Sequence, residues 1–546
     1  MSQELPSKGY VAGGSQSPAV DTDAEALAGL GYVPVLKRSF GLIESFASSF
    51  CAMNFIGVTR VLLYIGLATG GSAAIWSSSV VSIVGVTITA AVLAEICSAL
   101  PISGSIYVWA SEAAGKRAGR LVGFVVGWWA ATAWVSFVAS NSQAPAQFLL
   151  SLMVVFDKEF PGGLDASNVT YRGALFGVSF GCMWIALLLN YLPPKWFART
   201  FRFTVYLLLL DLVLSLIWLP IGVSRTYGFR TAKEVFTGRN NGTGFGEAWN
   251  WALSFYYAGY VACGYDAAGH IAEETKNASL TAARGIFWSA FAAAVCSLIA
   301  TTLWLFCIPP DELLYSFDAP QPFVQIWQAS IGKGGAVVMT IIAVLGLILS
   351  TSCAVTASSR LIFAIARDGI LPGSKWISTP NSAGQPKNAI TLIAVLSTVL
   401  LIISIGSQVA FTSLLSAGAV TSISAYALIS FCRLLVTPHE FKHTRWSLGK
   451  WGPFFYAFAF AYNTFLLTVL YSPLEYPFTA ATFNFAIVII GAVSIFGILS
   501  WWFIPADKWL RPELIASMRS HAVQDGDEAG IYIGSEGERK SDTAAY

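Results

Sequence analysis

Apolar runs of about 20 residues recur along this 546-residue chain and constrain its fold more than any other feature. A run of that length is what an α-helix needs to cross the hydrocarbon core of a bilayer. Only 11% of the residues are charged and 55% are apolar, whereas soluble domains carry about 25% charged residues. A water-soluble protein of this length could not cover so much apolar surface. We therefore expect an all-α membrane protein.

The runs predict about twelve membrane spans, separated by short polar loops. The stretch before residue 40 and the stretch after residue 505 are polar or charged, which predicts two tails outside the membrane. The predicted spans are 41–68, 75–100, 121–154, 174–192, 203–223, 249–271, 286–308, 335–365, 389–405, 411–435, 453–471 and 480–504.

Lysine and arginine are unequally divided between the two alternating sets of loops. The set that contains Lys116 and Lys375 is the richer one, and such loops usually face the cytosol. With an even number of spans, both termini are then cytosolic. Asn168 and Asn241 begin Asn-x-Thr sequons in the opposite loops and are candidate glycosylation sites. The plasma membrane is the expected location, with the vacuolar membrane as the alternative.

Two spans contain residues that weaken a helix at mid-membrane. The sixth carries Gly264-Tyr265-Asp266, which combines a glycine with an acid, and the first carries small and polar residues over 48–57. A broken helix exposes backbone groups that can bind a solute, but small residues can equally mark close helix packing. Breaks in spans 1 and 6 would occupy corresponding positions of two five-span halves, as in inverted-repeat carriers.

Three sequence blocks identify a family resemblance. They are GYDAAGHIAEETKNA over 264–278 followed by ARGI over 283–286, AEICSALPISGSIY over 94–107, and SSR at 358–360 with ARDGILP over 366–372. In order and spacing they resemble the fungal amino-acid/choline (GABA permease-like) transporters of the amino acid–polyamine–organocation superfamily. The resemblance covers roughly residues 40 to 505.

The resemblance implies a five-plus-five inverted repeat with two peripheral helices. Tails would cover 1–39 and 506–546, the repeats 40–223 and 224–435, and the peripheral spans 436–505. The implied function is secondary active transport, by alternating access, of a small amino acid or amine such as GABA or choline. Protons are the expected coupling ion.

The resemblance also places the substrate between the two breaks. Free N–H groups of half-helix N-termini could hold a carboxylate, and Asp266 could hold an ammonium group. The implied binding residues are Met53, Asn54, Phe55, Ile56, Gly57, Cys263, Gly264, Tyr265 and Asp266.

Further polar residues inside the spans have open roles. Arg60 could bind a substrate carboxylate or act as a gate residue paired with an unidentified acid. Asp211 is a candidate proton acceptor or a structural hydrogen-bonding acid, and Asp266 could itself carry the coupling proton. Asn141 could line the pathway or bond a neighbouring helix, and Trp134 is a candidate for binding a cation.

Ser352 and Thr356 are further candidates for substrate, gate or sodium contacts, or for helix packing. The cysteines are scattered through apolar runs without a metal or disulfide spacing, so no cofactor is expected. His439-Glu440-x-x-His443 fits the H-E-x-x-H zinc protease pattern, although it falls in a short polar loop. A membrane metalloprotease is thus a remote alternative, and a nutrient sensor of the same fold is the nearer one.

Overall fold

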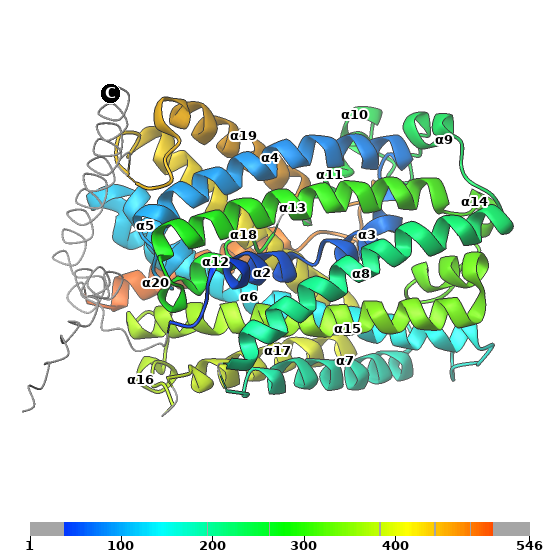
Figure 1. Ribbon diagram of the computed structural model, residues 1–546, viewed down its shortest axis with the longest axis horizontal. Helices are drawn as coiled ribbons and strands as arrows, with labels where there is room; N and C mark the ends of the chain where they lie inside the picture. Colours follow the sequence, from blue (N-terminus) through cyan, green and yellow to red (C-terminus); the bar gives the residue numbers. More distant parts are fainter. Residues whose placement is uncertain are drawn as a thin grey trace, which may run out of the picture.

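The computed structural model describes residues 38–505 except 194, 261–262, 382–383, 442–443 and 481. Within these residues every named element is a helix (Figure 1). The elements are α2 (Leu42–Met53), α3 (Phe55–Ala68), α4 (Gly71–Ala99), α5 (Ser105–Ala113), α6 (Gly115–Val155), α7 (Val169–Leu189), α8 (Lys195–Arg225), α9 (Ala232–Thr237), α10 (Glu247–Leu253), α11 (Phe255–Tyr260), α12 (Ala267–His270), η1 (Ala272–Glu274), α13 (Ala278–Cys307), α14 (Asp311–Leu314), α15 (Phe323–Arg367), α16 (Ser374–Ile377), α17 (Lys387–Gly406), α18 (Gln408–Leu435), η2 (Gly449–Trp451), α19 (Gly452–Tyr471) and α20 (Ala486–Phe503).

In this described part of the chain, eleven helices are long and apolar enough to cross a membrane. The sixth expected span does not count among them, because it is divided into α10, α11, α12 and η1. With that broken crossing, the prediction of an all-α membrane protein with about twelve spans is confirmed. The long helices run side by side, so the bundle has two ends (Figure 1). We call them the α16 end, which also holds α5, and the α9 end, which also holds α14.

Helix packing relates the first five spans to the next five. α4 packs along α13, and α6 packs along α15, which pairs span 2 with span 7 and span 3 with span 8. The broken spans 1 and 6 run in opposite directions and contact each other through α2 and α12. This pattern is that of an inverted repeat. α19 packs on α18 and α4, and α20 packs on α6 and α18, outside the two repeats.

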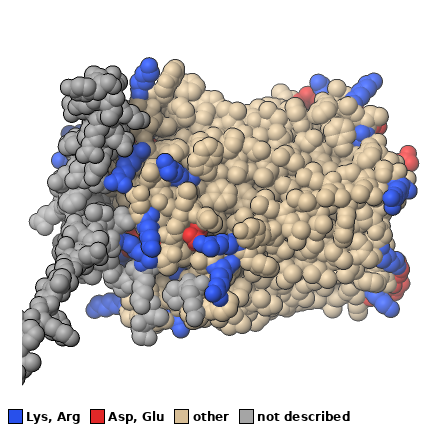
Figure 2. All heavy atoms as spheres, in the orientation of Figure 1, with Lys and Arg blue, Asp and Glu red and all other residues tan. Residues whose placement is uncertain are grey.

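Exposed apolar side chains form the surface between the two ends. On α8, for example, Phe203, Tyr206 and Ile217 are at least half exposed. On the face drawn in Figure 2, lysine, arginine and acidic residues gather toward the ends and leave an uncharged band between them. Lipid is the solvent in which such a band is stable.

Three helices extend further than their apolar runs predict. α6 begins at Gly115, α8 at Lys195 and α15 at Phe323, each several residues before the expected start. The added turns of α6 and α8 are largely basic and continue the helix beyond the hydrocarbon layer, which hydropathy alone does not detect. The added start of α15, residues 323–331, is largely apolar and is set off from the rest of the helix by a kink at Gly332 (φ 77°, ψ 174°). Arg202 in the added part of α8 forms an ion pair with Glu44 of α2, so this extension also joins two spans.

Candidate substrate-binding site

The first span is interrupted at a single residue. α2 ends at Met53 and α3 begins at Phe55, with Asn54 between them in the left-handed conformation (φ 40°, ψ 57°). Asparagine tolerates this conformation better than most residues. Its side-chain oxygen accepts a hydrogen bond from the Gly57 N–H at 3.2 Å. The break is therefore stabilised locally, and the start of α3 is capped by the protein itself.

The break in span 6 is held by a serine of span 1. Gly264 has φ 100°, a conformation that glycine adopts readily and other residues rarely. The Ser49 hydroxyl donates to the Tyr265 carbonyl at 2.7 Å and accepts from the Ala268 N–H at 2.9 Å. Because one side chain of span 1 satisfies a backbone group within the break and another in the first turn of α12, it holds the two interrupted spans together here.

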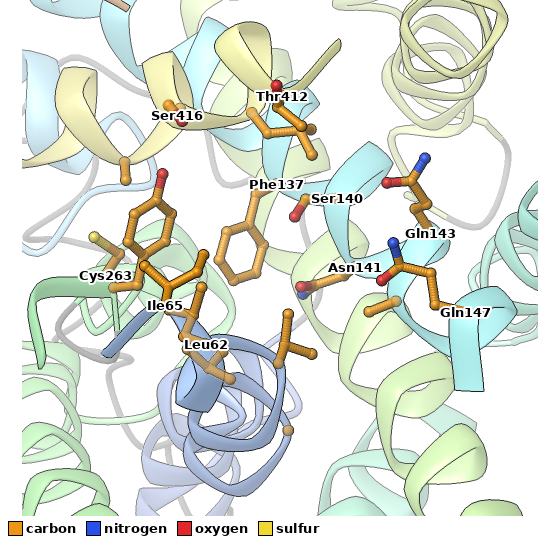
Figure 3. Close-up of a pocket in the computed structure, with 18 of the residues that line it drawn as sticks. Leu62, Ile65, Phe137, Ser140, Asn141, Gln143, Gln147, Cys263, Thr412 and Ser416 are labelled. Atoms are coloured by element: carbon orange, nitrogen blue, oxygen red, sulfur yellow. The ribbon is translucent and has the colours of Figure 1, made fainter. Parts of the chain in front are cut away.

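A cavity of about 420 Å³ lies beside the breaks. Its walls come from α3, α6, α11 and α18, and the loop over 320–322 contributes as well. The α6 and α18 segments that line it are the halves nearer the α9 end, so the cavity lies on that side of the breaks. Figure 3 shows Phe137, Ser140 and Asn141 of α6 facing Leu62 and Ile65 of α3 across this space.

Five aromatic rings and five carboxamides line the cavity together with many aliphatic side chains, and no described lining residue is charged or a histidine. The hydroxyl of Tyr256 lies 3.2 Å from the Ser416 hydroxyl and 3.3 Å from that of Tyr260. The aromatic lining residues are Tyr64, Trp134, Phe137, Tyr256 and Tyr260, and the carboxamides are Asn141, Gln143, Gln147, Gln321 and Gln408. Such a surface suits a solute with flat, partly polar rings.

Asp266 lies behind this wall and is only 4% exposed. The Tyr426 hydroxyl donates to its Oδ1 at 2.7 Å. His270 Nε2 lies 3.2 Å from its Oδ2, without the alignment of a hydrogen bond. The other ring nitrogen of His270 is 2.5 Å from the Ser105 hydroxyl. Trp134 packs edge-on against the His270 ring at 5.2 Å between centroids, so it contacts both the cavity and this buried polar group.

The expected binding residues divide into two groups. Gly57, Cys263, Gly264 and Asn141 line the cavity. The remaining ones are buried beside it and are not among the lining residues: Met53, Asn54, Phe55, Ile56, Tyr265 and Asp266. Trp134, the candidate cation contact, is part of the lining.

Arg60 and Asp211 are paired with each other. Two guanidinium nitrogens of Arg60 each lie 2.6 Å from a carboxylate oxygen of Asp211, and one of them also reaches Ser215 at 2.9 Å. Both side chains are buried. Arg60 is thus enclosed between helices and is not a cavity-lining residue, and Asp211 is the acid partner that sequence reasoning did not identify.

Ser352 and Thr356 bond a residue at the end of α7. The Asn190 amide donates to the Ser352 hydroxyl at 3.0 Å, and the Thr356 hydroxyl donates to the Asn190 oxygen at 2.7 Å. All three side chains are buried. These contacts are the interhelical hydrogen bonds that polar residues form in membrane bundles.

Ion pairs close the bundle at the α16 end. Glu274 binds Arg360 at 2.7 Å, Glu273 binds Arg367 at 3.1 Å, and Arg433 binds Glu95 at 3.1 Å. The first two pairs join η1, at the end of span 6, to α15. The backbone segment at 39–40 also bonds the Glu274 carbonyl at 3.0 Å. The cavity therefore lies on the α9 side of a packed, ion-paired layer.

Several lining residues were missed by sequence reasoning. On α6 these are residues 133, 137, 144 and 147, which share one helical face of the cavity wall, and on α18 they are residues 408, 412, 415, 416 and 419. The available signal was the recurrence of small and polar residues on one face of an apolar span, which is clearer on α18 than on α6. Nothing in the local sequence of Tyr256 or Tyr260 separates them from the many interfacial aromatics.

The structure describes only part of the H-E-x-x-H motif over residues 439–443. His439 and Glu440 lie in the loop after α18, and His443 lies outside the described residues. Within the described part, no group of three or more histidine, cysteine or acidic residues could hold a metal ion. Asn168 and Asn241 both lie in loops at the α9 end, where each amide group donates to backbone carbonyls.

Two interrupted antiparallel spans that meet beside a central cavity define a permease of the broken-helix class. This chain belongs to the amino acid permease family, whose model matches residues 40–493. The thiamine transporter thi9 of Schizosaccharomyces pombe is 42% identical to it over 90% of this chain and 87% of the relative. The amino-acid permease BAT1 of Arabidopsis thaliana is 29% identical over 91% of this chain and 98% of the relative.

Solved structures share the fold. A manganese transporter of Eremococcus coleocola superposes with a TM-score of 0.51, covering 89% of this chain and 98% of that chain at 12% identity. The chain is thus a multi-pass membrane protein with the fold of a transporter. The resemblance to amino acid permeases identified from the sequence blocks is confirmed at the level of the family.

Proposed function

We propose that this protein transports thiamine, or a closely related aromatic organic cation, across its membrane by alternating access. The observation that carries the proposal is the uncharged, aromatic and carboxamide-rich wall of the central cavity. The relative that is 42% identical and bears the name of a thiamine transporter supports the same substrate.

The cavity is poorly suited to a carboxylate. None of its lining residues is basic, and the N–H of Gly57 at the start of α3 is already bonded to Asn54. A carboxylate placed there would lose its hydration without gaining a counter-charge, which is unfavourable. These features weigh against GABA and other amino acids.

A cation has better partners in this cavity. Tyr256, Tyr260 and Trp134 present aromatic rings, whose faces attract cations. The first half of span 6 also ends here with α11, and the C-terminal end of a helix carries partial negative charge. Choline would share the aromatic contacts, but it would leave the carboxamides of the wall without partners.

Proton coupling is part of the proposal, and Asp266 is its proposed site. Buried acids elsewhere, such as Asp211 and Glu274, are paired with arginine. Asp266 is paired with His270, a group that can itself gain or lose a proton. A proton could therefore be held beside the break in span 6 and change the contact between spans 6 and 10 made through Tyr426.

The orientation follows from charge. The α16 end carries the loops that are richer in lysine and arginine, so we assign it to the cytosol. The cavity then lies on the extracytosolic side, and the ion-paired layer closes the cytosolic side. The plasma membrane is the location most consistent with uptake from outside.

The test is uptake of radiolabelled solutes by cells that lack their own thiamine, choline and amino-acid permeases. We expect saturable uptake of thiamine, faster at acid than at neutral external pH. Uptake of GABA or choline in place of thiamine would overturn the proposed substrate assignment. If no solute accumulates while surface labelling confirms the protein at the plasma membrane, the nutrient-sensor alternative replaces transport.

A further inference from the structure

Three carboxamide side chains gather on the cavity wall of α6. Asn141, Gln143 and Gln147, which we call the amide cluster, all line the cavity, and Figure 3 labels all three on α6. Gln143 and Gln147 lie about one turn apart on the helix, and Asn141 lies two residues before Gln143. Pro145 sits within the same stretch of α6.

Two members of the amide cluster have unused hydrogen-bonding groups. Asn141 is 8% exposed and Gln143 is 5% exposed, yet the amide nitrogens of both have no hydrogen-bond partner within the described structure. A buried unpaired amide is unfavourable. The amide oxygen of Gln408, a cavity-lining residue of α18, has no partner within the described structure either.

Three buried carboxamides away from the cavity behave differently, whereas the amide nitrogen of Asn54 at the break in span 1 is unpaired as well. Asn190 donates to Ser352, Asn250 donates to the Asn240 carbonyl, and Asn463 donates to Thr89. Those amides join one segment of the fold to another. The amide cluster makes no such connection, so its donors and acceptors are available to whatever occupies the cavity.

We propose that the amide cluster binds the aminopyrimidine ring of the substrate. An aminopyrimidine presents an exocyclic amine donor beside a ring-nitrogen acceptor. A carboxamide can pair with both at once, as asparagine and glutamine do with the same donor–acceptor pattern on adenine. The inference rests on the proposed function, and it assigns the part of the cavity that distinguishes thiamine-like solutes from simple quaternary amines.

The placement divides the substrate between two regions. The thiazolium ring lies against Tyr256, Tyr260 and Trp134 beside the breaks, where the aromatic faces stabilise its charge. The aminopyrimidine ring lies further toward the α9 end, beside the amide cluster. Choline has no group for the second region and gains nothing from it.

The test measures competition for labelled thiamine on the purified full chain in lipid nanodiscs. The competitors are the aminopyrimidine alcohol half of thiamine and an N-methylated thiazolium half. In the Asn141→Leu and Gln143→Met variants, we expect the aminopyrimidine half to compete roughly tenfold more weakly, because the bidentate pair is lost. Competition by the thiazolium half should stay within twofold.

Asn388→Leu is the matched control, because the Asn388 amide donates to the Trp376 and Thr379 carbonyls beside α16 and Asn388 is not among the cavity-lining residues. It should leave both inhibition constants unchanged. If competition by both halves weakens equally in the α6 variants, the effect is merely structural and the inference is overturned. The inference is also overturned if competition by neither half weakens.

The wild-type protein provides a test that does not depend on the variants folding. If thiamine binds and the thiazolium half displaces it but the aminopyrimidine half does not, the amide cluster is not its site and the proposed function stands. If the wild-type protein does not bind thiamine at all, the proposed function fails, and the inference fails with it.

Discussion

Arg60 and Asp211 form a buried bidentate ion pair, with both nitrogen–oxygen distances at 2.6 Å. It connects the second half of span 1 to the middle of span 5. The guanidinium carbon of Arg60 also lies 5.0 Å from the ring centroid of Trp304 and 4.9 Å from that of Trp327. Both charges are thus removed from water and depend on each other.

We predict that Asp211→Asn lowers the stability of the folded protein by about 3–5 kcal/mol, because it leaves Arg60 as an uncompensated buried charge. Thermal unfolding in detergent measures the effect. The double variant Arg60→Met with Asp211→Leu should recover most of the loss, since it removes both charges.

Asp157→Asn is the matched control, because Asp157 forms an exposed ion pair with Lys333 and such pairs contribute about 0–1 kcal/mol. An Asp211→Asn protein as stable as this control would show that the buried pair is not needed for folding.

Gly264→Ala should destabilise the break in span 6. An alanine at φ 100° is strained, and left-handed backbone costs other residues about 1–2 kcal/mol. The strain does not come from a steric clash, because the atom nearest to an added Cβ would be the Cβ of Ala52 at 3.8 Å. We expect a lower unfolding temperature and slower uptake.

Gly259→Ala provides the comparison, one turn earlier. Gly259 lies within α11, and its added Cβ would meet Leu466 at 3.4 Å, an ordinary contact. This change should be neutral or slightly stabilising, because alanine has the higher helix propensity. Equal effects of the two substitutions would contradict the role assigned to the break.

Glu274→Gln should loosen the closed α16 end. The change removes the charge that pairs with Arg360 between η1 and α15, and hydrogen bonds to charged groups contribute about 1.5–3 kcal/mol. Cys51 is buried and contacts α8, so it becomes reachable when α2 separates. In a background without the other cysteines, we expect its labelling by a thiol reagent to be at least about fivefold faster.

The exposed Glu312 on α14 gives a matched control at the opposite end. In the Glu312→Gln variant, Cys51 should be labelled at the wild-type rate. If Glu274→Gln also labels at that rate in a protein that remains folded, the pair with Arg360 does not control access.

Asp266→Asn should abolish uptake without preventing folding. Asparagine can still accept the Tyr426 hydrogen bond, but it cannot hold the charge that faces His270. Uptake at two external pH values, with surface expression measured in parallel, tests this. Normal uptake with the wild-type pH dependence would show that Asp266 does not take part in proton coupling. The same substitution at Asp318, an exposed loop residue, should have no effect.

The sequence by itself determined the membrane class, the positions of the spans and the sites of both breaks. These features are local, because a long apolar run predicts a span and Gly264 predicts an interruption within its own helix. Sequence blocks also identified the family. The longer starts of α6 and α8 escaped prediction, because basic turns that extend beyond the membrane have no apolar signal. The start of α15 escaped because Gly332-Lys333-Gly334-Gly335 interrupts the apolar run at the kink.

Only the tertiary structure decided which side chains meet. It paired Arg60 with Asp211, bonded Ser352 and Thr356 to Asn190, and placed Asp266 behind the cavity wall. Each of these contacts joins different helices, and helical periodicity fixes only the face of one helix. The cavity of Tyr256, Tyr260 and the amide cluster exists because α3, α6, α11 and α18 converge there, a relationship set by packing between distant segments.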